Sequence, residues 1–403
     1  MQKKLIENLL IENRKELRSI LEFWVQKSVD RKNGGFVGQI NKKGEPVDEA
    51  EKGLILNARI LWTFSRAYRF WGDKKYLQLA QRAYDYFIDY FWDNKNGGVF
   101  WAVDFCGNVT SNRKQIYGQA FGIYALSEYY RATGNKESLN YSIEIVRLIE
   151  TYSFDKKHGG YIEAFTSDWK TLADFRLSEK DANYPKSMNT HLHILESYSN
   201  LYRVWKNDAL KEQITGLIHI FLNRIIHSKT HHFNLFFERD WSVPLNLVSY
   251  GHDIEGAWLI NEAARLIDNN ELFAKTKKRT KKMVDAVLEE GMYPDGSSII
   301  YEKNEDSGEY NKERHWWVQA EAMVGLLDAF INSGNKAYFE TYQRVWSFIK
   351  DSIIDYKYGG WYDVIEEDGT VRNTGLKGGF WVCPYHNSRA LIETSLLLEK
   401  INE

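Results

Sequence analysis

The amino-acid sequence predicts an all-α fold, a closed (α/α)6 barrel made of six helical hairpins. The first observation is a repeat: a pair of glycines followed by an aromatic residue or valine recurs about every 63 residues in the first half of the chain. The second observation is that two helical segments accompany each of these marks. The marks lie at 34–36, 97–101, 159–161 and 359–361, with degenerate copies at 231–233 and 294–296.

Each repeat predicts an outer helix, then a short β-hairpin, then an inner helix. Residues 74–92 are typical of the outer helices, because apolar side chains recur at helical spacing along one face. The hairpins follow the glycine pair, and Asp368-Gly369 is the clearest turn because Asp-Gly tolerates positive φ. The inner helices, richer in apolar and small residues, are expected at 52–68, 113–130, 186–202, 246–264, 314–330 and 384–400.

The two ends of the chain favour closure of the barrel. An open helical array needs polar capping repeats, and neither end of this sequence resembles one. No stretch rich in proline, glycine and serine interrupts the repeats, so we predict a single domain over residues 1–403. An open helical solenoid is the alternative that the repeat alone leaves open.

Composition argues against several classes of partner. The formal net charge of −2 gives no reason to expect nucleic acid or an anionic membrane surface. No signal peptide is recognisable, and no apolar run approaches the roughly 20 residues of a membrane span. With only two cysteines, Cys106 and Cys383, the chain is expected to be cytoplasmic. Aromatic residues make up 15% of the sequence, which favours a carbohydrate ligand because aromatic rings stack on sugars.

Chemically capable side chains recur in the early half of the inner helices. In an (α/α)6 barrel these positions meet at one end of the central cavity. There the six units together supply the polar and aromatic groups that a binding site needs. The candidates on this frame are Arg59, Tyr117, Asn189, His193, His252, Trp317, Glu321 and His386.

Two of the histidines open predicted helices. His252 follows Gly251, and Glu255 lies three residues later on the same helical face, where it is expected to orient the imidazole. His386 follows Pro384, a favourable residue for the first turn of a helix. Both histidines are therefore expected at the mouth of the barrel.

A third histidine comes from a closely spaced pair. His191 and His193 are two residues apart, so only one of them faces the cavity. We choose His193, because it shares a face with Asn189 and Glu196. His191 is expected outside the cavity or behind its lining. The remaining histidines are expected to be structural, at positions 158, 219, 227, 231, 232 and 315.

A metal site is an alternative that these residues leave open. Three histidines with Glu255 would be a plausible zinc set, since three protein ligands and one water form the catalytic pattern. The His-Glu-x-x-His and cysteine-rich signatures are absent, as are the glycine-rich phosphate loops. We therefore predict neither a metal nor a nucleotide cofactor.

Large aromatic side chains and a buried arginine lie beside the polar cluster. Arg59 stands between Ala58 and Ile60 in an apolar helix, so it needs a polar partner, either a ligand or a buried ion pair. Four tryptophans are candidates to stack on sugar rings or to line the barrel: Trp258, Trp316, Trp317 and Trp381.

Five segments around these residues form a specific set: 53–62 (GLILNARILW), 188–193 (MNTHLH), 249–255 (SYGHDIE), 316–321 (WWVQAE) and 383–387 (CPYHN). Together they resemble the cellobiose 2-epimerases, a family within the N-acylglucosamine 2-epimerase superfamily. The resemblance extends along nearly the whole chain. It implies an (α/α)6 barrel, which agrees with the repeat count obtained independently.

The resemblance also implies roles for individual residues. His252 and His386 would be the acid/base pair, and His193 would assist opening of the sugar ring. The residues expected to bind or orient the substrate are Arg59, Tyr117, Asn189, Glu255, Trp258, Trp317, Glu321 and Trp381.

Two further segments bear on this resemblance. The longer connection at 175–185 is expected to form a lid, with Asp181 as a sugar contact. Ser388 stands where the family pattern has glycine. This departure is expected to alter packing behind His386 without changing the chemistry.

Inversion at C2 of a reducing sugar needs an open ring, because the free aldehyde acidifies the C2 proton. One base removes that proton to give a cis-enediolate, and an acid on the opposite face returns a proton. Histidine fits both tasks near neutral pH. Arg59 is expected to stabilise the charge that develops on oxygen, and Glu255 and Glu321 are expected to orient the histidines.

The expected substrate is a reducing β-1,4-linked disaccharide: cellobiose would give glucosyl-mannose, and lactose would give epilactose. A monomer or weak dimer is expected. Alternatives are an aldose–ketose isomerase acting on mannose or glucose and an N-acylglucosamine 2-epimerase. An inverting glycoside hydrolase would need two carboxylates about 6.5–9.5 Å apart. A non-catalytic sugar-binding module would not need a histidine pair.

Overall fold

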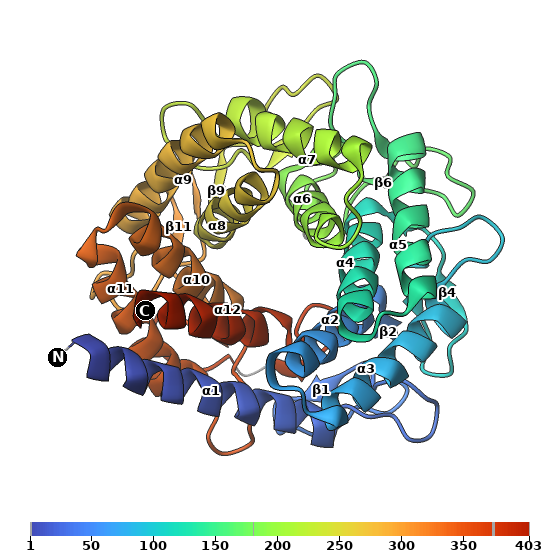
Figure 1. Ribbon diagram of the computed structural model, residues 1–403, viewed down its shortest axis with the longest axis horizontal. Helices are drawn as coiled ribbons and strands as arrows, with labels where there is room; N and C mark the ends of the chain where they lie inside the picture. The colour runs from blue at the N-terminus through green and yellow to red at the C-terminus, as the bar shows by residue number, and fades with distance from the viewer. Residues whose placement is uncertain (1, 180, 373–374, 403) are drawn as a thin grey trace.

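The computed structural model describes residues 2–179, 181–372 and 375–402. Within these ranges twelve α-helices form two concentric rings around a central axis, which confirms the predicted (α/α)6 barrel (Figure 1). The inner ring consists of α2 (Leu54–Trp71), α4 (Ile116–Thr133), α6 (Met188–Tyr202), α8 (Tyr250–Leu266), α10 (Trp316–Ser333) and α12 (Tyr385–Asn402). The outer ring consists of α1 (Gln2–Lys27), α3 (Lys74–Tyr86), α5 (Lys136–Leu148), α7 (Asp208–Ile220), α9 (Asn270–Glu290) and α11 (Lys336–Phe348).

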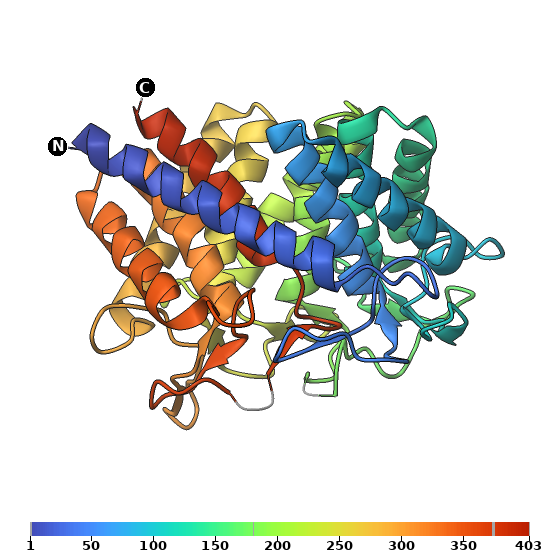
Figure 2. The same ribbon diagram turned by 90° about the horizontal axis from the view of Figure 1, so that it is seen from below.

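The barrel is closed, so the open solenoid is excluded. Each inner helix packs against the next around the ring, and α12 returns to pack against α2. The outer helix α1 packs against α12, which brings the two ends of the chain side by side (Figures 1 and 2). The strand β14 (Leu376–Gly378) also pairs with β1 (Ile40–Asn41), which joins the last unit to the first.

Tight αα-turns connect each inner helix to the following outer helix. Gly72, for example, ends α2 in the left-handed conformation at φ 72°, and Asp73 then caps α3 by accepting a hydrogen bond from the backbone N–H of Lys75. The same side-chain cap opens four other outer helices, at Asn135, Asn207, Asn269 and Asn335. Four outer helices end in a five-residue π-helical turn, at η1 (Phe87–Phe91), η2 (Ile149–Ser153), η3 (Phe221–Ile225) and η4 (Ile349–Ile353).

Short antiparallel strands gather at one end of the barrel, as predicted (Figure 2). Their pairing differs from the prediction of one hairpin in each unit, because most pairs join neighbouring units. The sheets are β2 (Lys52–Gly53) with β3 (Ala102–Val103) and β4 (Val109–Ser111); β5 (Lys114–Gln115) with β6 (Ala164–Phe165); β7 (Lys186–Ser187) with β8 (Phe236–Phe237); β9 (Leu247–Ser249) with β10 (Glu302–Asn304) and β11 (Tyr310–Asn311); and β12 (Arg314–His315) with β13 (Val364–Ile365).

These strands explain why most inner helices begin a few residues later than predicted. The residues directly before five of the inner helices pair with a strand of the next unit, as Lys114 and Gln115 do before α4. Their backbone groups bond across the ladder and are not available for the helix. Each inner helix therefore starts directly at the strand-bearing end of the barrel, where the polar candidates lie in its first turns.

Buried lysine–aspartate pairs hold this end together. Lys114 Nζ lies 2.8 Å from Asp93 Oδ2, and both side chains are buried. Asp93 also accepts hydrogen bonds from the backbone N–H groups of Lys95 and Asn96, which fixes the turn before the glycine pair. The same pairing recurs at Lys52–Asp30, Lys186–Asp155 and Lys377–Asp355.

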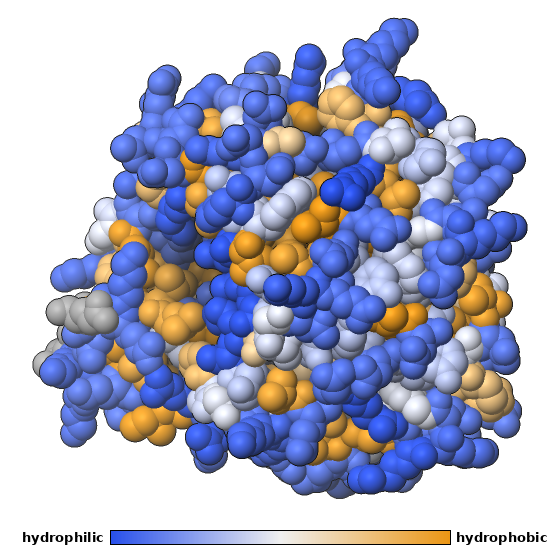
Figure 3. Space-filling view, turned by 45° about the vertical axis from the view of Figure 1, so that its right-hand side comes forward, coloured by the Kyte–Doolittle hydropathy of each residue, from blue (hydrophilic) through white to orange (hydrophobic). Residues whose placement is uncertain are grey.

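The opposite end is held by arginines in the last turns of the inner helices. Each one reaches a polar residue on the next inner helix, in the pairs Arg69–Glu128, Arg131–Asn200, Arg203–Glu262 and Arg265–Asp328. A cavity of about 230 Å³ opens at this end, and hydrophilic residues gather in the hollow on this face (Figure 3). No described helix is long and apolar enough to cross a membrane.

Replacing Lys114 by methionine is expected to lower the free energy of unfolding by about 3–5 kcal/mol, because it leaves the Asp93 carboxylate buried without a counter-ion. Urea unfolding followed by circular dichroism measures this loss. The control is Arg203→Ala, which breaks the partly exposed pair with Glu262 and is expected to cost about 1 kcal/mol or less. Equal losses in the two variants would contradict the role given to the buried pairs.

Candidate active site

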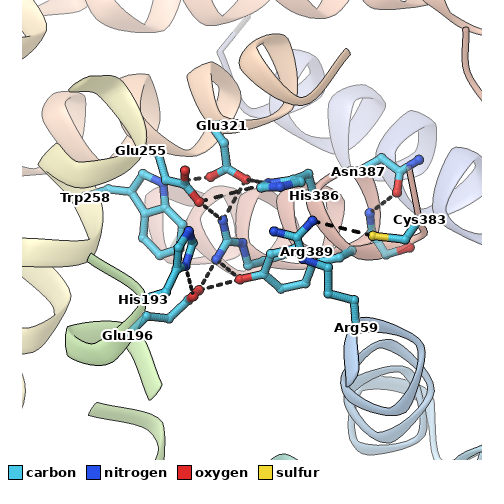
Figure 4. A network of polar contacts seen from close by, with 12 residues as sticks. Arg59, His193, Glu196, Glu255, Trp258, Glu321, Cys383, His386, Asn387 and Arg389 are labelled. Atoms are coloured by element: carbon cyan, nitrogen blue, oxygen red, sulfur yellow. Dashed lines mark hydrogen bonds and ion pairs between the residues drawn. The ribbon is translucent and has the colours of Figure 1, made fainter. Parts of the chain in front are cut away.

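A buried arginine at the centre of the barrel organises the candidate site. Arg389 on α12 is surrounded by three glutamates from three other inner helices (Figure 4). Its Nη2 lies 2.6 Å from Glu255 Oε1 and 2.7 Å from Glu321 Oε1, and its Nη1 bonds to Glu196. Because all four side chains are buried, each charge depends on the others for compensation.

Two of these glutamates orient histidines. His386 Nδ1 lies 2.6 Å from Glu321 Oε1, and His193 Nδ1 lies 2.8 Å from Glu196 Oε2. Burial raises the pKa of Glu321, and the bonds from Arg389 and Trp258 oppose this rise by favouring the ionised form. An ionised carboxylate only accepts hydrogen bonds, so each imidazole bonded to one carries its hydrogen on Nδ1. The Nε2 atoms of His386 and His193 are left to exchange protons. Glu321 thus contacts a histidine, and its predicted role in orienting the imidazole stays a prediction.

The predicted pairing of Glu255 with His252 is wrong. Glu255 bonds to Arg389 and lies 4.0 Å from His386 Nδ1, because the guanidinium is the strongest partner within its reach. His252 instead contacts a neutral group: its Nδ1 lies 2.7 Å from the hydroxyl of Ser249. Burial, together with the nearby His193, lowers the pKa of His252 to about 3, so its imidazole is neutral at pH 7.

The indole of Trp317 lies against both histidines of the predicted acid/base pair. Its ring centroid is 4.8 Å from that of His252 and 5.7 Å from that of His386. The two imidazoles come from α8 and α12, which pack on either side of α10, the helix that carries Trp317 (Figure 1). A substrate atom near Trp317 therefore has two neighbouring imidazoles from separate helices.

Arg59 reaches the same region from α2. Its Nη2 donates to Tyr117 Oη at 2.9 Å, and its guanidinium stacks over the rings of Phe121 and Tyr385 at 4.4 and 4.9 Å. Its contacts within the described residues are aromatic, hydroxyl, sulfur and carbonyl groups, so the ion-pair interpretation of Arg59 is wrong. A buried cation held in this way is available to an anionic or polar ligand atom.

A cleft of about 510 Å³ opens beside this cluster at the strand-bearing end. Asn189, His252 and Asp181 line it, as the sequence predicts for a binding site. Asn189 Oδ1 is buried and has no hydrogen-bond partner among the described residues, so it is ready to accept from a ligand. Asp181 accepts hydrogen bonds from Ser178 within the segment 175–185, of which Lys180 lies outside the described residues.

Two of the candidate tryptophans differ in how far their side chains are exposed to solvent. Trp381 is 37% exposed and its ring lies 5.9 Å from that of Tyr117, so it offers a free face at the mouth. Trp258 is only 6% exposed and donates its Nε1–H to Glu321 at 3.1 Å. Trp258 therefore supports the Arg389 network, and its predicted contact with substrate stays a prediction.

A metal was the alternative for these side chains. Glu255, Glu321 and His386 do bring ligand-type atoms within 4.8 Å of one another. However, Arg389 Nη2 bonds to both carboxylates, so a guanidinium already supplies the positive charge between them. A cation there would be repelled by Arg389. This donor set fits an arginine better than a metal.

Two residues of this site had no predicted functional role. Arg389 stands before the apolar run 390–392, and like Arg59 it is a charged residue in an apolar helix that needs a polar partner. His315 was expected to be structural, yet it lines the cleft, stacked on Tyr301 with ring centroids 3.8 Å apart.

Ser388, which stands where the family pattern has glycine, is fully buried, and its hydroxyl has no hydrogen-bond partner among the described residues.

The other histidine of the closely spaced pair is structural, as predicted. His191 Nδ1 donates to the carbonyl of Ser187 at 2.6 Å, and its Nε2 accepts from the backbone N–H of Tyr161 at 2.9 Å. Both ring nitrogens are therefore occupied by backbone groups. Burial lowers the pKa of His191 to about 4, which keeps this imidazole neutral at pH 7.

The chain is similar over nearly its whole length to known sugar epimerases. Residues 34–390 match the family model described as N-acylglucosamine 2-epimerase (GlcNAc 2-epimerase). The cellobiose 2-epimerase of Bacteroides fragilis is 46% identical over 388 residues, covering 96% of this chain and 98% of the relative. The solved cellobiose 2-epimerase from Bacillus thermoamylovorans B4167 superposes with a TM-score of 0.93 at 38% identity, over 98% of this chain and 100% of that one. A D-mannose isomerase structure, 20% identical with a TM-score of 0.86, shares the fold.

Replacing Arg389 by methionine is expected to lower the free energy of unfolding by about 3–5 kcal/mol, because three buried carboxylates lose their shared counter-ion. Adding Glu255→Gln is expected to recover part of this loss, since it removes one uncompensated charge. Urea unfolding of the single and double variants measures both effects. A double variant no more stable than Arg389→Met alone would contradict the charge balance assigned to the network.

Glu163 makes stability depend on pH. Burial raises its pKa to about 8, although Thr190 and Ser187 donate hydrogen bonds to it. A carboxyl whose pKa rises on folding contributes stability that is fully present below the unfolded value near 4.5 and is lost as pH rises to 8. Glu163→Gln removes this dependence, so its stability relative to the parent is expected to rise by about 1.4 kcal/mol per pH unit within that window. Urea unfolding at pH 5, 6.5 and 8 measures the trend, and a constant difference would contradict it.

Proposed function

The chain belongs to the N-acylglucosamine 2-epimerase family, which confirms the resemblance drawn from its motifs, and we propose that it catalyses the reaction of a cellobiose 2-epimerase. In this reaction the C2 centre of the reducing-end glucose of a β-1,4-linked disaccharide is inverted. The observation that carries the proposal is the pair His252 and His386, which come from separate helices and both contact Trp317. Relatives named cellobiose 2-epimerase, at 35–46% identity, support it.

The first step is opening of the sugar ring. His193 carries its hydrogen on Nδ1, toward Glu196, and presents Nε2 to the cavity. This nitrogen is suited to accept the proton of the anomeric hydroxyl and to return it to the ring oxygen. Against the effect of burial, Arg389 and the bond from His193 lower the pKa of Glu196 to about 2, which keeps Glu196 an acceptor throughout.

Inversion then needs two proton transfers on opposite faces of C2. The C2–H bond breaks, its proton passes to one imidazole Nε2, and the electron pair forms the cis-enediolate. The second imidazole enters the step protonated on Nε2 and delivers that proton to the other face, which forms the new C2–H bond. Before the next turnover the first imidazole loses its captured proton to solvent, and the second takes up a proton from solvent. His252 is a free base at neutral pH. Burial, together with the nearby Arg59 and Arg389, lowers the pKa of His386 well below its ordinary value, so His386 in its protonated form gives up a proton readily. The contact of Nδ1 with Glu321 keeps the ring oriented during this transfer.

Arg59 is placed to stabilise the enediolate. Its guanidinium is held between aromatic rings and a tyrosine hydroxyl, so its direction is fixed before the reaction begins. Charge develops on O1 and O2 as the C2 proton leaves. A donor oriented in advance in a buried site stabilises that charge more than water does.

A disaccharide suits the space around the histidines. The cleft of about 510 Å³ is lined by His252 and also by Tyr301 and His315. Trp381 offers an exposed indole face for stacking at the mouth. These features support a second sugar unit beyond the reacting one.

The cellular setting belongs to the proposal as well. Cys106 and Cys383 are both unpaired, which supports a reducing cytoplasmic location. We propose a single catalytic domain that acts as a monomer or weak dimer. The predicted independence from metals and nucleotides is part of the same proposal.

Incubation with cellobiose in D2O is expected to give glucosyl-mannose carrying deuterium at C2, measured by NMR after chromatographic separation. His252→Asn and His386→Asn are expected to lower kcat by about 10²–10⁴-fold, because each removes a proton-transfer group. His219→Asn, on the exposed face of α7, is the matched control and is expected to keep full activity.

Other reaction products would point to a different activity. A ketose as the sole product would show that the proton returns to C1, and the protein would be an aldose–ketose isomerase. Release of glucose would indicate a glycoside hydrolase. No C2-inverted product from any reducing disaccharide would overturn the proposal.

A further inference from the structure

Ser249 occupies the N-cap position of α8, but its hydroxyl does not cap the helix. Its backbone is extended, at φ −115° and ψ 101°, which is the usual conformation for an N-cap residue. Serine is among the preferred residues there because its oxygen accepts a hydrogen bond from a backbone N–H of the first turn. No such bond forms at Ser249.

Helices of the barrel whose N-cap residue is another serine, an asparagine or an aspartate do use that side chain as a cap. Ser187, the N-cap of the inner helix α6, accepts from the backbone N–H of Thr190 at 3.1 Å. Asn269, the N-cap of the outer helix α9, accepts from Leu272 at 3.0 Å. The hydroxyl of Ser249 is therefore directed elsewhere although a capping role was open to it.

The hydroxyl of Ser249 points instead to the imidazole of His252. Ser249 Oγ lies 2.7 Å from His252 Nδ1, and Ser249 is 5% exposed. The position of its backbone is fixed on the N-terminal side by the ladder in which Ser249 pairs with Glu302 of β10. The first turn of α8 fixes His252 relative to Ser249, so the contact joins two rigid elements.

We propose that Ser249 is a positioning residue that fixes the orientation and the tautomer of His252. The inference rests on the proposed function, in which His252 exchanges a proton with C2. A serine hydroxyl can donate to Nδ1 or accept from it. The role of His252 as a base needs the second arrangement, in which Nδ1–H is donated to Ser249 Oγ and the lone pair lies on Nε2. Without this acceptor, the hydrogen can sit on either ring nitrogen, and the ring is free to turn about its Cβ–Cγ bond.

The chemical type of the partner matters as much as its position. His193 and His386 have carboxylate partners, whereas His252 has a neutral hydroxyl. A carboxylate stabilises an imidazolium and so retains a captured proton. A hydroxyl gives the same orientation without that stabilisation. His252 therefore releases a captured proton readily, which suits a base that must be deprotonated again in every turnover.

The test uses two substitutions at one position. Ser249→Ala removes the acceptor and is expected to lower kcat for C2 inversion by about ten- to hundred-fold, the range typical of groups that orient a functional histidine. Ser249 also lines the cleft, but its hydroxyl is directed to His252, so kcat is expected to fall by a larger factor than KM changes. Ser249→Thr keeps the hydroxyl and is expected to restore most of the activity.

A matched control separates positioning from helix capping. Asn269→Ala removes a working cap far from the cleft, so it is expected to lower the thermal unfolding midpoint and leave kcat unchanged. Ser249→Ala is expected to show the reverse, because its hydroxyl caps nothing. A loss of stability in Ser249→Ala comparable to that of Asn269→Ala, with unchanged kcat, would overturn the proposal.

A readout without substrate keeps this test independent of the proposed function. In ¹⁵N NMR spectra of the ring-labelled protein, His252 is expected to show hydrogen on Nδ1 alone, and Ser249→Ala is expected to show a mixture of tautomers. If both forms give the same ring-nitrogen shifts, the proposal is wrong even where epimerisation is observed. If the tautomer changes but no disaccharide is epimerised, the proposed function fails and the positioning role of Ser249 stands.

Discussion

The site depends on one buried interaction, the guanidinium of Arg389 shared by three carboxylates. Glu196, Glu255 and Glu321 come from α6, α8 and α10, and Arg389 comes from α12. Three buried carboxylates would repel one another without it, so four helices of the inner ring are held at fixed distances by this arginine. Two of the same carboxylates orient His193 and His386. Fold and site therefore share their central contacts.

The choice of hydrogen-bond partner separates three chemically identical imidazoles. A carboxylate behind His193 or His386 orients the ring and carries a negative charge, whereas the hydroxyl behind His252 orients the ring without a charge. The neutral ring of Tyr117 contacts His193, and that of Trp317 contacts His252. In the proposed reaction, these differences in partner divide ring opening, proton removal and proton return among the three histidines.

The sequence predicted the frame of the molecule well, because the frame repeats. Six copies of a helix–turn–helix unit reveal the barrel through spacing alone, and the early turns of the inner helices must then meet at one end. A contact between two residues far apart in the sequence produces no repeat or local spacing from which it could be predicted. Glu255 was assigned to His252 because local helical spacing favours it, yet its true partner, Arg389, lies 134 residues further along the chain. The strand pairs that join neighbouring units were missed for the same reason, since each strand has only two or three residues.

In the proposed mechanism, C2 of an open sugar chain lies between the imidazoles of His252 and His386. A crystal structure with the reduced disaccharide cellobiitol, whose terminal unit stays open, tests it most directly. The account predicts that C2 lies between His252 Nε2 and His386 Nε2, one on each face, each about 3–3.5 Å away. A complex in which both imidazoles approach the same face of C2, or in which neither approaches it, would contradict the account.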